Sequence, residues 1–396
     1  MSVSTPQDGN PPVMILIAKA FQTPDIPRAA QEAETFSKNH QVYVFAWDRY
    51  VEYPSREVRG SVEIISYHVG NTKKFVKFGL FFGALLFQIA LIVGTMRLCR
   101  RLQSRPIVVA HDINTLPVAC LLKVLGRTSA MIYDCRELTF ALYSEWYNSI
   151  IGSFVGIAET YLLHFADAVI TVSEGIAHHL KQFGSSATVI YNCPKLSDIP
   201  ACSTDEARKR LGLPKTDFII SCVATLRYGC GLEVLVEVAR RLQGTNVRIV
   251  IVGEGPLRPW LETEASNINR NNLSLISRKP KQTALTYVKA SNLTWVVYDE
   301  GSLNGVVGMP WKLFESIACG IPVIVEPNTL RSRFVEENGC GIILRNTNPN
   351  EVANTLSQYS KNTAAYGIIH ERTRKLSGQY TWEEESNKLL AVLNQF

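Results

Sequence analysis

The chain has 396 residues, of which 46% are hydrophobic and 19% are charged, and its formal net charge is +6. This composition is that of a globular chain long enough for two domains, and it excludes a disordered chain. The positive balance favours anionic partners such as phosphorylated donors and anionic lipids. No nucleic-acid-binding motif and no basic stripe interleaved with aromatic residues occurs, so we expect no nucleic-acid partner.

The nine cysteines are scattered along the chain and form no Cys-x-x-Cys pair. An odd number of cysteines without metal-ligand spacing is typical of reduced thiols in a reducing compartment. The segment from Ser4 to Pro12 is polar and proline-rich, and it lacks the charged start and apolar core of a secretion signal. The sequence therefore predicts a cytoplasmic protein.

Short apolar runs alternate with helical patterns over residues 1–195, which predicts an α/β domain with a parallel sheet. No glycine-rich phosphate fingerprint follows the first run, which argues against a dinucleotide at this end. The predicted strands of this half lie at 13–17, 41–47, 62–68, 107–110, 131–133 and 168–172.

Polar side chains follow two of these predicted strands. His111 and Asp112 come directly after one, and Arg136 and Glu137 come shortly after another. In an open α/β sheet such positions project into the ligand crevice. A lone histidine is more often structural, but its place after a strand favours a ligand-facing role for His111. Arg136 stays charged and cannot act as a base, so we expect it to bind a phosphate.

Phe78 to Met96 is a run of largely apolar residues that only Gln88 and Thr95 interrupt. It is long enough for a transmembrane helix, but a span here would cut a βα domain in two. A buried core helix and a helix on an anionic membrane surface are the alternatives, and we favour the membrane surface, contacted through residues 73–105. The flanking cations are Lys73, Lys74, Lys77, Arg97, Arg100, Arg101 and Arg105.

Glu145 to Phe165 has the pattern of one helix of mixed polarity. Its large apolar side chains are spaced to share one face, and we expect this face to belong to the core. These side chains are Trp146, Ile150, Phe154, Ile157 and Tyr161.

A second α/β domain is predicted over residues 196–378, after a linker rich in turn-forming residues. Arg227 lies in a glycine-rich loop before a helix whose N-terminus can receive a diphosphate. A Gly253-Glu254-Gly255 turn follows the next strand, and we expect the later loop from Tyr298 to Gly308 to be flexible. The predicted strands lie at 218–223, 247–252, 273–276, 293–297, 321–325 and 340–344.

The stretch from Met309 to Ile324 predicts a loop, a short helix and a buried strand. Pro310 suits the first turn of the helix. Lys312 and Glu315 are three residues apart and therefore share a helical face near the N-terminal end. A cation, a carboxylate and the positive end of a helix dipole together suit a phosphorylated ligand with hydroxyl groups. The alternative is an ordinary surface ion pair.

The same stretch resembles the P-x-K-[LF]-[FY]-E-x-x-A-x-G-x-P-V signature of GT-B glycosyltransferases, in particular glycosyltransferase family 4 (glycosyl transferases group 1). The resemblance implies an α/β protein of two Rossmann-like domains that face each other across a cleft, with residues 379–396 forming a helix that crosses back to the first domain. It also implies a retaining hexosyltransferase without a metal or cofactor, which uses a UDP- or GDP-sugar and a glycan or lipid-linked acceptor.

The resemblance also assigns roles to individual residues. Catalytic roles fall to His111, Asp112, Arg227 and Lys312. The donor would contact Arg227, Gly253, Glu254, Arg278, Pro310, Lys312, Leu313 and Glu315, with Glu315 on the nucleotide ribose and Lys312 near the phosphates. The acceptor side would contain His111, Asp112, Arg136 and Glu137.

Three positions depart from the family pattern. Cys230 replaces a basic residue, Arg136 a histidine, and Val307 a glutamate. These departures suggest a first rival, a non-catalytic GT-B partner protein. A second rival is a GT-B nucleotide-sugar epimerase. We expect a protein peripheral to the cytoplasmic face of a membrane, and the sequence sets no oligomeric state.

Overall fold

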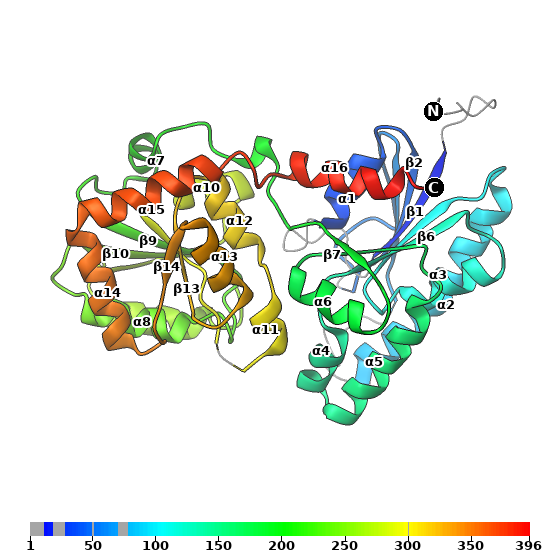
Figure 1. Cartoon of the computed structure of the whole chain (residues 1–396), viewed down its shortest axis with the longest axis horizontal. Helices are drawn as coiled ribbons and strands as arrows, with labels where there is room; N and C mark the ends of the chain where they lie inside the picture. The colour runs from blue at the N-terminus through cyan, green and yellow to red at the C-terminus, as the bar shows by residue number, and fades with distance from the viewer. Residues whose placement is uncertain (1–11, 19–27, 50, 70–77, 300) are drawn as a thin grey trace. The chain divides into compact units, whose positions relative to one another are not determined.

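The computed structural model describes residues 12–18, 28–49, 51–69, 78–299 and 301–396, with only the backbone given at 78–82. The chain folds into two compact units (Figure 1), and each is described by itself. Unit 1 comprises Met1–Ile190 together with Lys388–Phe396, and unit 2 comprises Tyr191–Asn387. The boundary between the two units lies after Ile190, close to the domain boundary predicted at residue 195.

Unit 1 is built on a sheet with the strand order β3-β4-β2-β1-β5-β6-β7-β8. All neighbouring pairs are parallel except the antiparallel pair of β3 and β4. The strands are β1 (Val13–Ala18), β2 (Gln41–Trp47), β3 (Arg56–Arg59), β4 (Val62–Tyr67), β5 (Ile107–His111), β6 (Ala130–Cys135), β7 (Ala168–Thr171) and β8 (Ala187–Val189). The helices are α1 (Arg28–Phe36), α2 (Phe78–Arg101), α3 (Leu116–Val124), α4 (Thr139–Trp146), α5 (Ser149–Leu163) and α6 (Glu174–Gln182).

The connections of unit 1 divide its helices between the two faces of the sheet. The chain moves from β1 to β2 in one direction along the sheet, and from β4 through β5, β6 and β7 to β8 in the other. Because such crossovers are right-handed, α1 covers one face, while α2, α3, α5 and α6 cover the other. In Figure 1, α1 lies beside β1, and α3, α5 and α6 lie below the strands. The strand order reverses between β1 and β5.

Helix α2 is largely apolar, but only a minority of its described residues, 83–101, are buried. Phe87 packs on the sheet, with its ring stacked on that of Trp47 at a centroid distance of 5.3 Å. The opposite side exposes Leu85, Ile89 and Val93. By length and composition alone, α2 could cross a membrane. Its packing on the sheet favours a helix that lies along unit 1, and Lys73, Lys74 and Lys77 lie outside the described residues.

The single helix predicted for Glu145 to Phe165 is wrong in two respects. The chain forms two helices, α4 and α5, because Asn148 caps α5 by accepting a hydrogen bond from the Ile151 amide, at 3.0 Å. The apolar face expected in the core is exposed instead: Ile150 and Phe154 retain 79% and 73% of their accessible surface.

Unit 2 contains a parallel sheet with the strand order β11-β10-β9-β12-β13-β14. The order reverses between β9 and β12, which is the point where ligands bind in doubly wound sheets. The strands are β9 (Phe218–Val223), β10 (Val247–Val252), β11 (Leu273–Ile276), β12 (Leu293–Trp295), β13 (Val323–Val325) and β14 (Gly341–Ile343). The helices are η1 (Leu196–Asp198), α7 (Thr204–Leu211), α8 (Leu232–Arg241), α9 (Arg258–Ser266), α10 (Lys281–Lys289), α11 (Leu303–Val307), α12 (Trp311–Ala318), α13 (Leu330–Asn338), α14 (Pro349–Lys361) and α15 (Thr363–Leu376).

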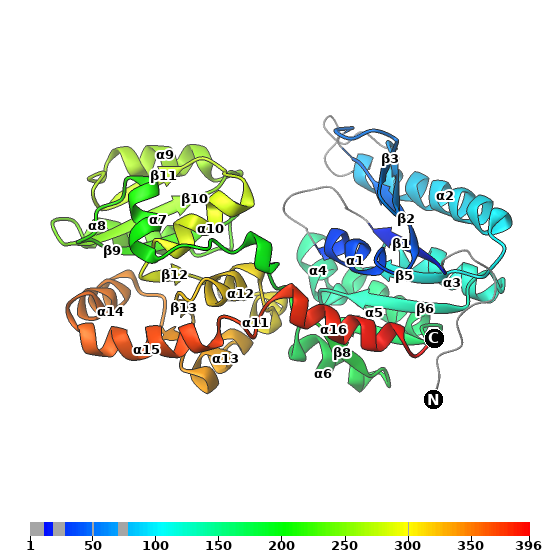
Figure 2. The ribbon, with the colours of Figure 1, turned by 90° about the horizontal axis from the view of Figure 1, so that it is seen from above.

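Helix α16 (Trp382–Leu393) contains the change from one unit to the other, since its residues from Lys388 onward group with unit 1 (Figure 2). Its start is tied to unit 2 by the Trp382 amide, which donates to the Pro194 carbonyl at 2.8 Å. The predicted α/β class with two Rossmann-like domains is confirmed.

Candidate functional site

The residues predicted to bind the donor gather at one edge of the unit 2 sheet. Arg227 follows β9, Gly253 and Glu254 follow β10, Arg278 follows β11, and the segment from Pro310 to Glu315 comes after β12. Because parallel strands end at the same edge, the fold brings these segments together beside the reversal between β9 and β12. Arg227, Glu254 and Arg278 are exposed there.

The loops after β9 and β10 pack on each other through two glycines. A Cβ atom on Gly253 would lie 1.9 Å from the Ala224 carbonyl oxygen, and one on Gly255 would lie 2.4 Å from that of Leu226. The Leu226 amide donates to the Glu254 carbonyl at 2.9 Å. The absence of side chains at these glycines thus permits the close approach that holds Arg227 beside the β10 turn.

Helix α8 begins directly beside this loop. Gly231, its N-cap, has a φ of 60°, a left-handed conformation that favours glycine. The first amides of a helix have no partner within it and suit an anion. Cys230, where the family pattern predicts a basic residue, is buried in the hydrophobic core and provides no charge to this helix end.

Lys312 is the most unusual residue at this edge. It lies in the first turn of α12, where Pro310 is the N-cap, and only 7% of it is exposed. Its Nζ lies 4.1 Å from the centroid of the Tyr298 ring. Among the residues that the structure describes, this amine has no hydrogen-bond partner. An ammonium group in this setting is poorly compensated and suits a buried anion.

Lys312 also lies close to the thiol of Cys222 on β9. Burial raises the pKa of Cys222 to about 11, and the nearby Lys312 offsets this only in part. The Cys222 thiol is therefore protonated at neutral pH and does not supply the anion that Lys312 lacks.

Glu315 stands one turn further along α12 and is partly exposed. Its Oε1 lies 3.2 Å from the Nζ of Lys281, at the start of α10. The same Nζ lies 4.7 Å from the centroid of the Trp311 ring. The sequence predicts that Leu313 contacts the donor. Its side chain is instead fully buried in a hydrophobic cluster and is not available for that contact.

A buried ion pair that we did not predict from the sequence supports the loop before α12. Arg331 on α13 pairs with Glu326 and donates to the carbonyls of Gly305 and Gly308 at 2.6 and 2.7 Å. Its Cζ lies 4.9 Å from the centroid of the Tyr298 ring, the ring that Lys312 also contacts. Burial lowers the pKa of Arg331 to about 10.

This pair has two consequences for the predicted site. The loop expected to be flexible contains the short helix α11, and Arg331 donates to the carbonyls of Gly305, in the middle of this helix, and of Gly308, its C-cap. The signal that would have revealed the pair is the rule applied to His111, because Glu326 is a polar residue directly after a buried strand.

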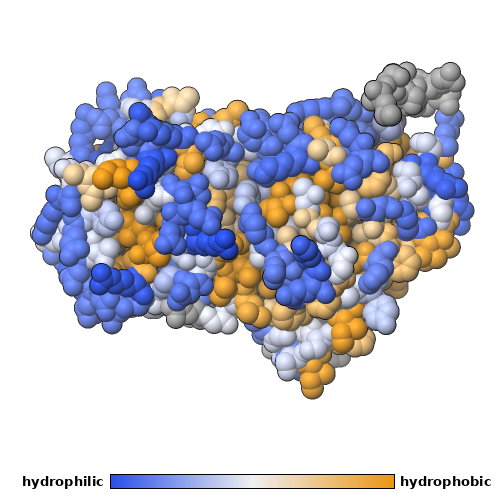
Figure 3. Space-filling view, viewed as in Figure 1, coloured by the Kyte–Doolittle hydropathy of each residue, from blue (hydrophilic) through white to orange (hydrophobic). Residues whose placement is uncertain are grey.

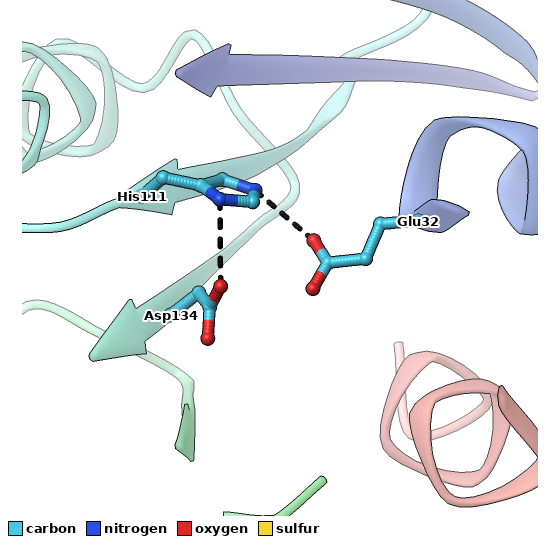
Figure 4. Close-up of side chains that lie close together, drawn as sticks. All are labelled: Glu32, His111 and Asp134. Carbon is cyan, nitrogen blue, oxygen red and sulfur yellow. Dashed lines mark ion pairs between the residues drawn. The ribbon is translucent and has the colours of Figure 1, made fainter. Parts of the chain in front are cut away.

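In unit 1, His111 lies in a buried cluster of charges where the strand order reverses. Its Nε2 lies 3.0 Å from the Oε2 of Glu32, and its Nδ1 lies 3.4 Å from the Oδ2 of Asp134 (Figure 4). None of these three side chains is exposed. Burial alone would raise the pKa of Glu32, but the charges of His111 and Arg28 outweigh it and lower that pKa.

Arg28 completes this cluster. Its Nε lies 2.9 Å from a carboxylate oxygen of Glu32 and 2.9 Å from one of Asp134. Glu32, His111 and Asp134 offer three potential metal ligands, but the guanidinium of Arg28 already forms ion pairs with both carboxylates. We therefore assign the cluster a structural role, and this burial of His111 differs from the acceptor contact that the sequence predicts.

Asp112 and Arg136 lie at the same edge of the unit 1 sheet and are partly exposed. The carboxylate of Asp112 forms a two-point ion pair with the guanidinium of Arg136. Asp112 has a φ of 60°, and its amide donates to the Asp134 carbonyl at 3.0 Å. The His111 carbonyl accepts a hydrogen bond from the Thr115 hydroxyl at 2.7 Å, which fixes the turn. Glu137 follows Arg136 and is exposed.

Residues 203–376 match the family "Glycosyl transferases group 1". The chain is 25% identical over 256 residues to D-inositol 3-phosphate glycosyltransferase of Thermobifida fusca, which covers 59% of this chain and 56% of that protein. It is 24% identical over 242 residues to the putative colanic acid biosynthesis glycosyltransferase WcaL of Escherichia coli, covering 59% and 58%. The chain thus spans little more than half the length of these curated relatives.

Solved structures show the same fold over almost the whole chain. Sucrose-phosphate synthase from Thermosynechococcus elongatus superposes with a TM-score of 0.80 at 16% identity, covering 97% of this chain and 98% of that one. HepE from Anabaena, solved in complex with UDP, gives a TM-score of 0.71 at 14% identity, covering 97% and 100%. Residues 203–376 therefore match the glycosyl transferases group 1 family, and the chain as a whole has a GT-B fold.

Proposed function

We propose that this protein transfers a sugar from a nucleotide-sugar donor to an acceptor. The observation that carries the proposal is the buried amine of Lys312, which lacks a hydrogen-bond partner among the described residues and shares the first two turns of α12 with Glu315. A diphosphate would provide the anion that Lys312 lacks. The ribose would provide hydroxyl groups that can donate hydrogen bonds to the carboxylate of Glu315.

The same residues suggest how the reaction is promoted. Negative charge develops on the leaving diphosphate as the sugar departs. Arg227, Lys312 and the first amides of α8 would stabilise this charge, so that the protein's own cations replace a metal ion. Retention of configuration and a hexose as the sugar are further parts of the proposal, which rest on the family that residues 203–376 match.

For the acceptor we propose a glycan or a lipid-linked glycan, bound at the edge of the unit 1 sheet. Asp112 and Arg136 are partly exposed polar residues there, and Glu137 is exposed. His111 would act indirectly, because its buried cluster fixes the end of β5 from which Asp112 projects. UDP is the favoured donor nucleotide because HepE, which shares the fold, was solved with UDP.

We also propose that the protein is peripheral to the cytoplasmic face of a membrane. The support is the exposed apolar side of α2 together with the exposed arginines that end and follow this helix. Both features would meet an anionic bilayer surface. A lipid-linked acceptor would then be within reach of unit 1.

A panel of UDP-, GDP- and dTDP-sugars tests the proposal. The purified protein is incubated with each donor, with and without a mixture of lipid and glycan acceptors, and nucleoside diphosphate release is measured. We expect release from one donor class that depends on an acceptor, and proton NMR of the product should show retention. Donor conversion without an acceptor would indicate an epimerase. No conversion of any donor would indicate a non-catalytic partner, for which Cys230 offers a reason.

A further inference from the structure

An exposed apolar stripe runs along α5. Ile150, Phe154, Ile157 and Tyr161 follow one another at spacings of four, three and four residues, so they share one side of the helix. They retain 79, 73, 60 and 74% of their accessible surface. Figure 3 shows hydrophobic side chains gathered at the lower end of unit 1, where Figure 1 places α4 and α5. A contiguous exposed patch of this kind marks an interaction site.

The surroundings of the stripe are apolar as well. From Trp146 to Ala158 the sequence contains no acidic or basic residue, and the exposed rings of Trp146 and Tyr147 stand at the turn between α4 and α5. A cavity of about 230 Å³ adjoins the stripe at Ile157 and extends between α5 and α6. Its apolar lining includes Phe140, Leu163, Leu180 and Phe183.

Charge complementarity favours an anionic bilayer as the partner of this surface. α2 lies in the same helix layer as α5, and both contact α3, which lies between them. α2 exposes an apolar side of its own and ends in the exposed cations Arg97, Arg100 and Arg101. Apolar side chains beside clustered arginines suit the boundary between acyl chains and anionic head groups.

The dimensions of α5 limit how it can meet a bilayer. The helix has 15 residues, which gives a length of about 22 Å. The hydrocarbon core of a bilayer is about 30 Å thick, so α5 is too short to span it. Trp and Tyr side chains, such as Trp146 and Tyr161, are typical of the head-group level. A helix of this kind lies in the interface.

We propose that the α4–α5 hairpin inserts the stripe of Ile150, Phe154, Ile157 and Tyr161 into the interface of an anionic bilayer. The inference rests on the membrane location proposed above and adds the element that inserts. α2 would then provide electrostatic attraction through its arginines, whereas the hairpin would provide a salt-resistant hydrophobic contribution. Glycosyl transfer itself does not depend on this assignment.

Flotation of the full chain with vesicles tests the assignment. The vesicles consist of phosphatidylcholine with phosphatidylglycerol, or of phosphatidylcholine alone, at low and high salt. The test variant carries Ile150→Ser, Phe154→Ser and Ile157→Ser. The control variant removes three exposed apolar side chains outside this helix layer: Val58→Ser, Leu196→Ser and Ile368→Ser.

We expect the test variant to lose at least about tenfold in vesicle binding and the control to bind like the wild type. Brominated lipids should quench part of the tryptophan fluorescence of the wild type, and Trp146→Phe should remove that part. Flotation of the test variant at the wild-type level would overturn the inference. So would a wild-type dimer in sedimentation that the test variant dissociates, with no flotation, since a second copy would then cover the stripe.

Nucleoside diphosphate binding and donor turnover, measured on the same samples, separate this inference from the proposed function. Both should be unchanged in the test and control variants, which also shows that the variants are folded. Flotation lost with turnover retained supports the hairpin assignment. Flotation that persists in a protein without donor turnover contradicts only the proposed function.

Discussion

The Nζ of Lys281 lies 3.2 Å from the Oε1 of Glu315, the carboxylate that we propose holds the donor ribose. Lys281 also lies over the ring of Trp311, in the first turn of the same helix. A carboxylate held by one cation on one oxygen retains acceptor capacity on the other. The pair therefore orients Glu315 and leaves its other oxygen able to accept hydrogen bonds from the ribose hydroxyl groups.

The first prediction concerns Glu315. Glu315→Ala should weaken binding of the donor's nucleoside diphosphate by about 2 kcal/mol, because charge-assisted hydrogen bonds are lost. Lys281→Ala should have a smaller effect, because the pair is partly exposed and screened. Titration calorimetry measures both. Glu262→Ala is the control, since Glu262 is an exposed carboxylate on α9. Wild-type affinity in folded Glu315→Ala would exclude the ribose role.

Replacement of Lys312 should raise the stability of the protein and lower its activity. Lys312→Met removes a buried amine that lacks a hydrogen bond, so the variant should gain about 1 kcal/mol of stability and melt at a higher temperature. Turnover should fall at least about tenfold, because a charged contact to the leaving group is lost. Calorimetric melting and initial rates are the measurements. Lys361→Met, at the exposed end of α14, should change neither. A less stable, fully active Lys312→Met would contradict the proposed role.

The Arg331–Glu326 pair should be necessary for the stability of unit 2. Arg331→Met leaves the buried Glu326 without its cation and releases the carbonyls of Gly305 and Gly308, which should cost about 3–5 kcal/mol. Arg333→Met on the same helix breaks an exposed pair with Glu337 and should cost less than about 1 kcal/mol. Urea unfolding measures both losses. Equal losses of unfolding free energy in the two variants would show that the buried pair stabilises unit 2 no more than the exposed pair does.

Glu159 on α5 should make stability depend on pH. Burial raises the pKa of Glu159 to about 6, although hydrogen bonds donated by the Tyr133 and Thr139 hydroxyls lower it. Because the folded pKa exceeds the ordinary value of 4.5, the folded state binds the proton more tightly. This contribution to stability is present below about pH 4.5 and is lost as pH rises through about 6, a loss of roughly 2 kcal/mol.

Glu159→Gln keeps an oxygen that can accept the same hydrogen bonds and removes the titration. The variant should therefore gain stability relative to the wild type as pH rises from about 4.5 to 7. Urea unfolding of both proteins at several pH values gives the difference, in which the other titrating groups cancel. A difference that does not vary with pH would show that Glu159 is not perturbed in this way.

Much of the fold could be predicted because its strands are short apolar runs separated by helical periods. The donor-binding edge could be predicted as well. Arg227, Gly253 and the α12 segment each follow such an apolar run, and parallel strands end at one edge of a sheet. The buried partners of His111 could not be predicted. Arg28 and Glu32 lie four residues apart on α1, but Asp134 lies on β6, and no spacing in the sequence indicates that they meet at His111 on β5.

The α5 stripe shows a different limit of the sequence. Ile150 and Phe154 have helical spacing whether their face packs on a sheet or remains exposed, so the periodicity predicted an apolar face without indicating what covers it. The partner of Glu315 was missed for a similar reason. Lys281 lies on α10, more than thirty residues earlier, and only the packing of α10 on α12 brings the two together.

We propose that the carboxyl edge of the unit 2 sheet binds the diphosphate of a nucleotide-sugar. Hydrogen–deuterium exchange of the full chain, with and without the nucleoside diphosphate of the accepted donor, tests this binding site. We expect the nucleotide to slow exchange at the start of α8 near Gly231, in the turn after Gly253 and in the first turns of α12 near Lys312, and Glu315→Ala to weaken the effect. Unchanged exchange at all three segments under saturating nucleotide would contradict it.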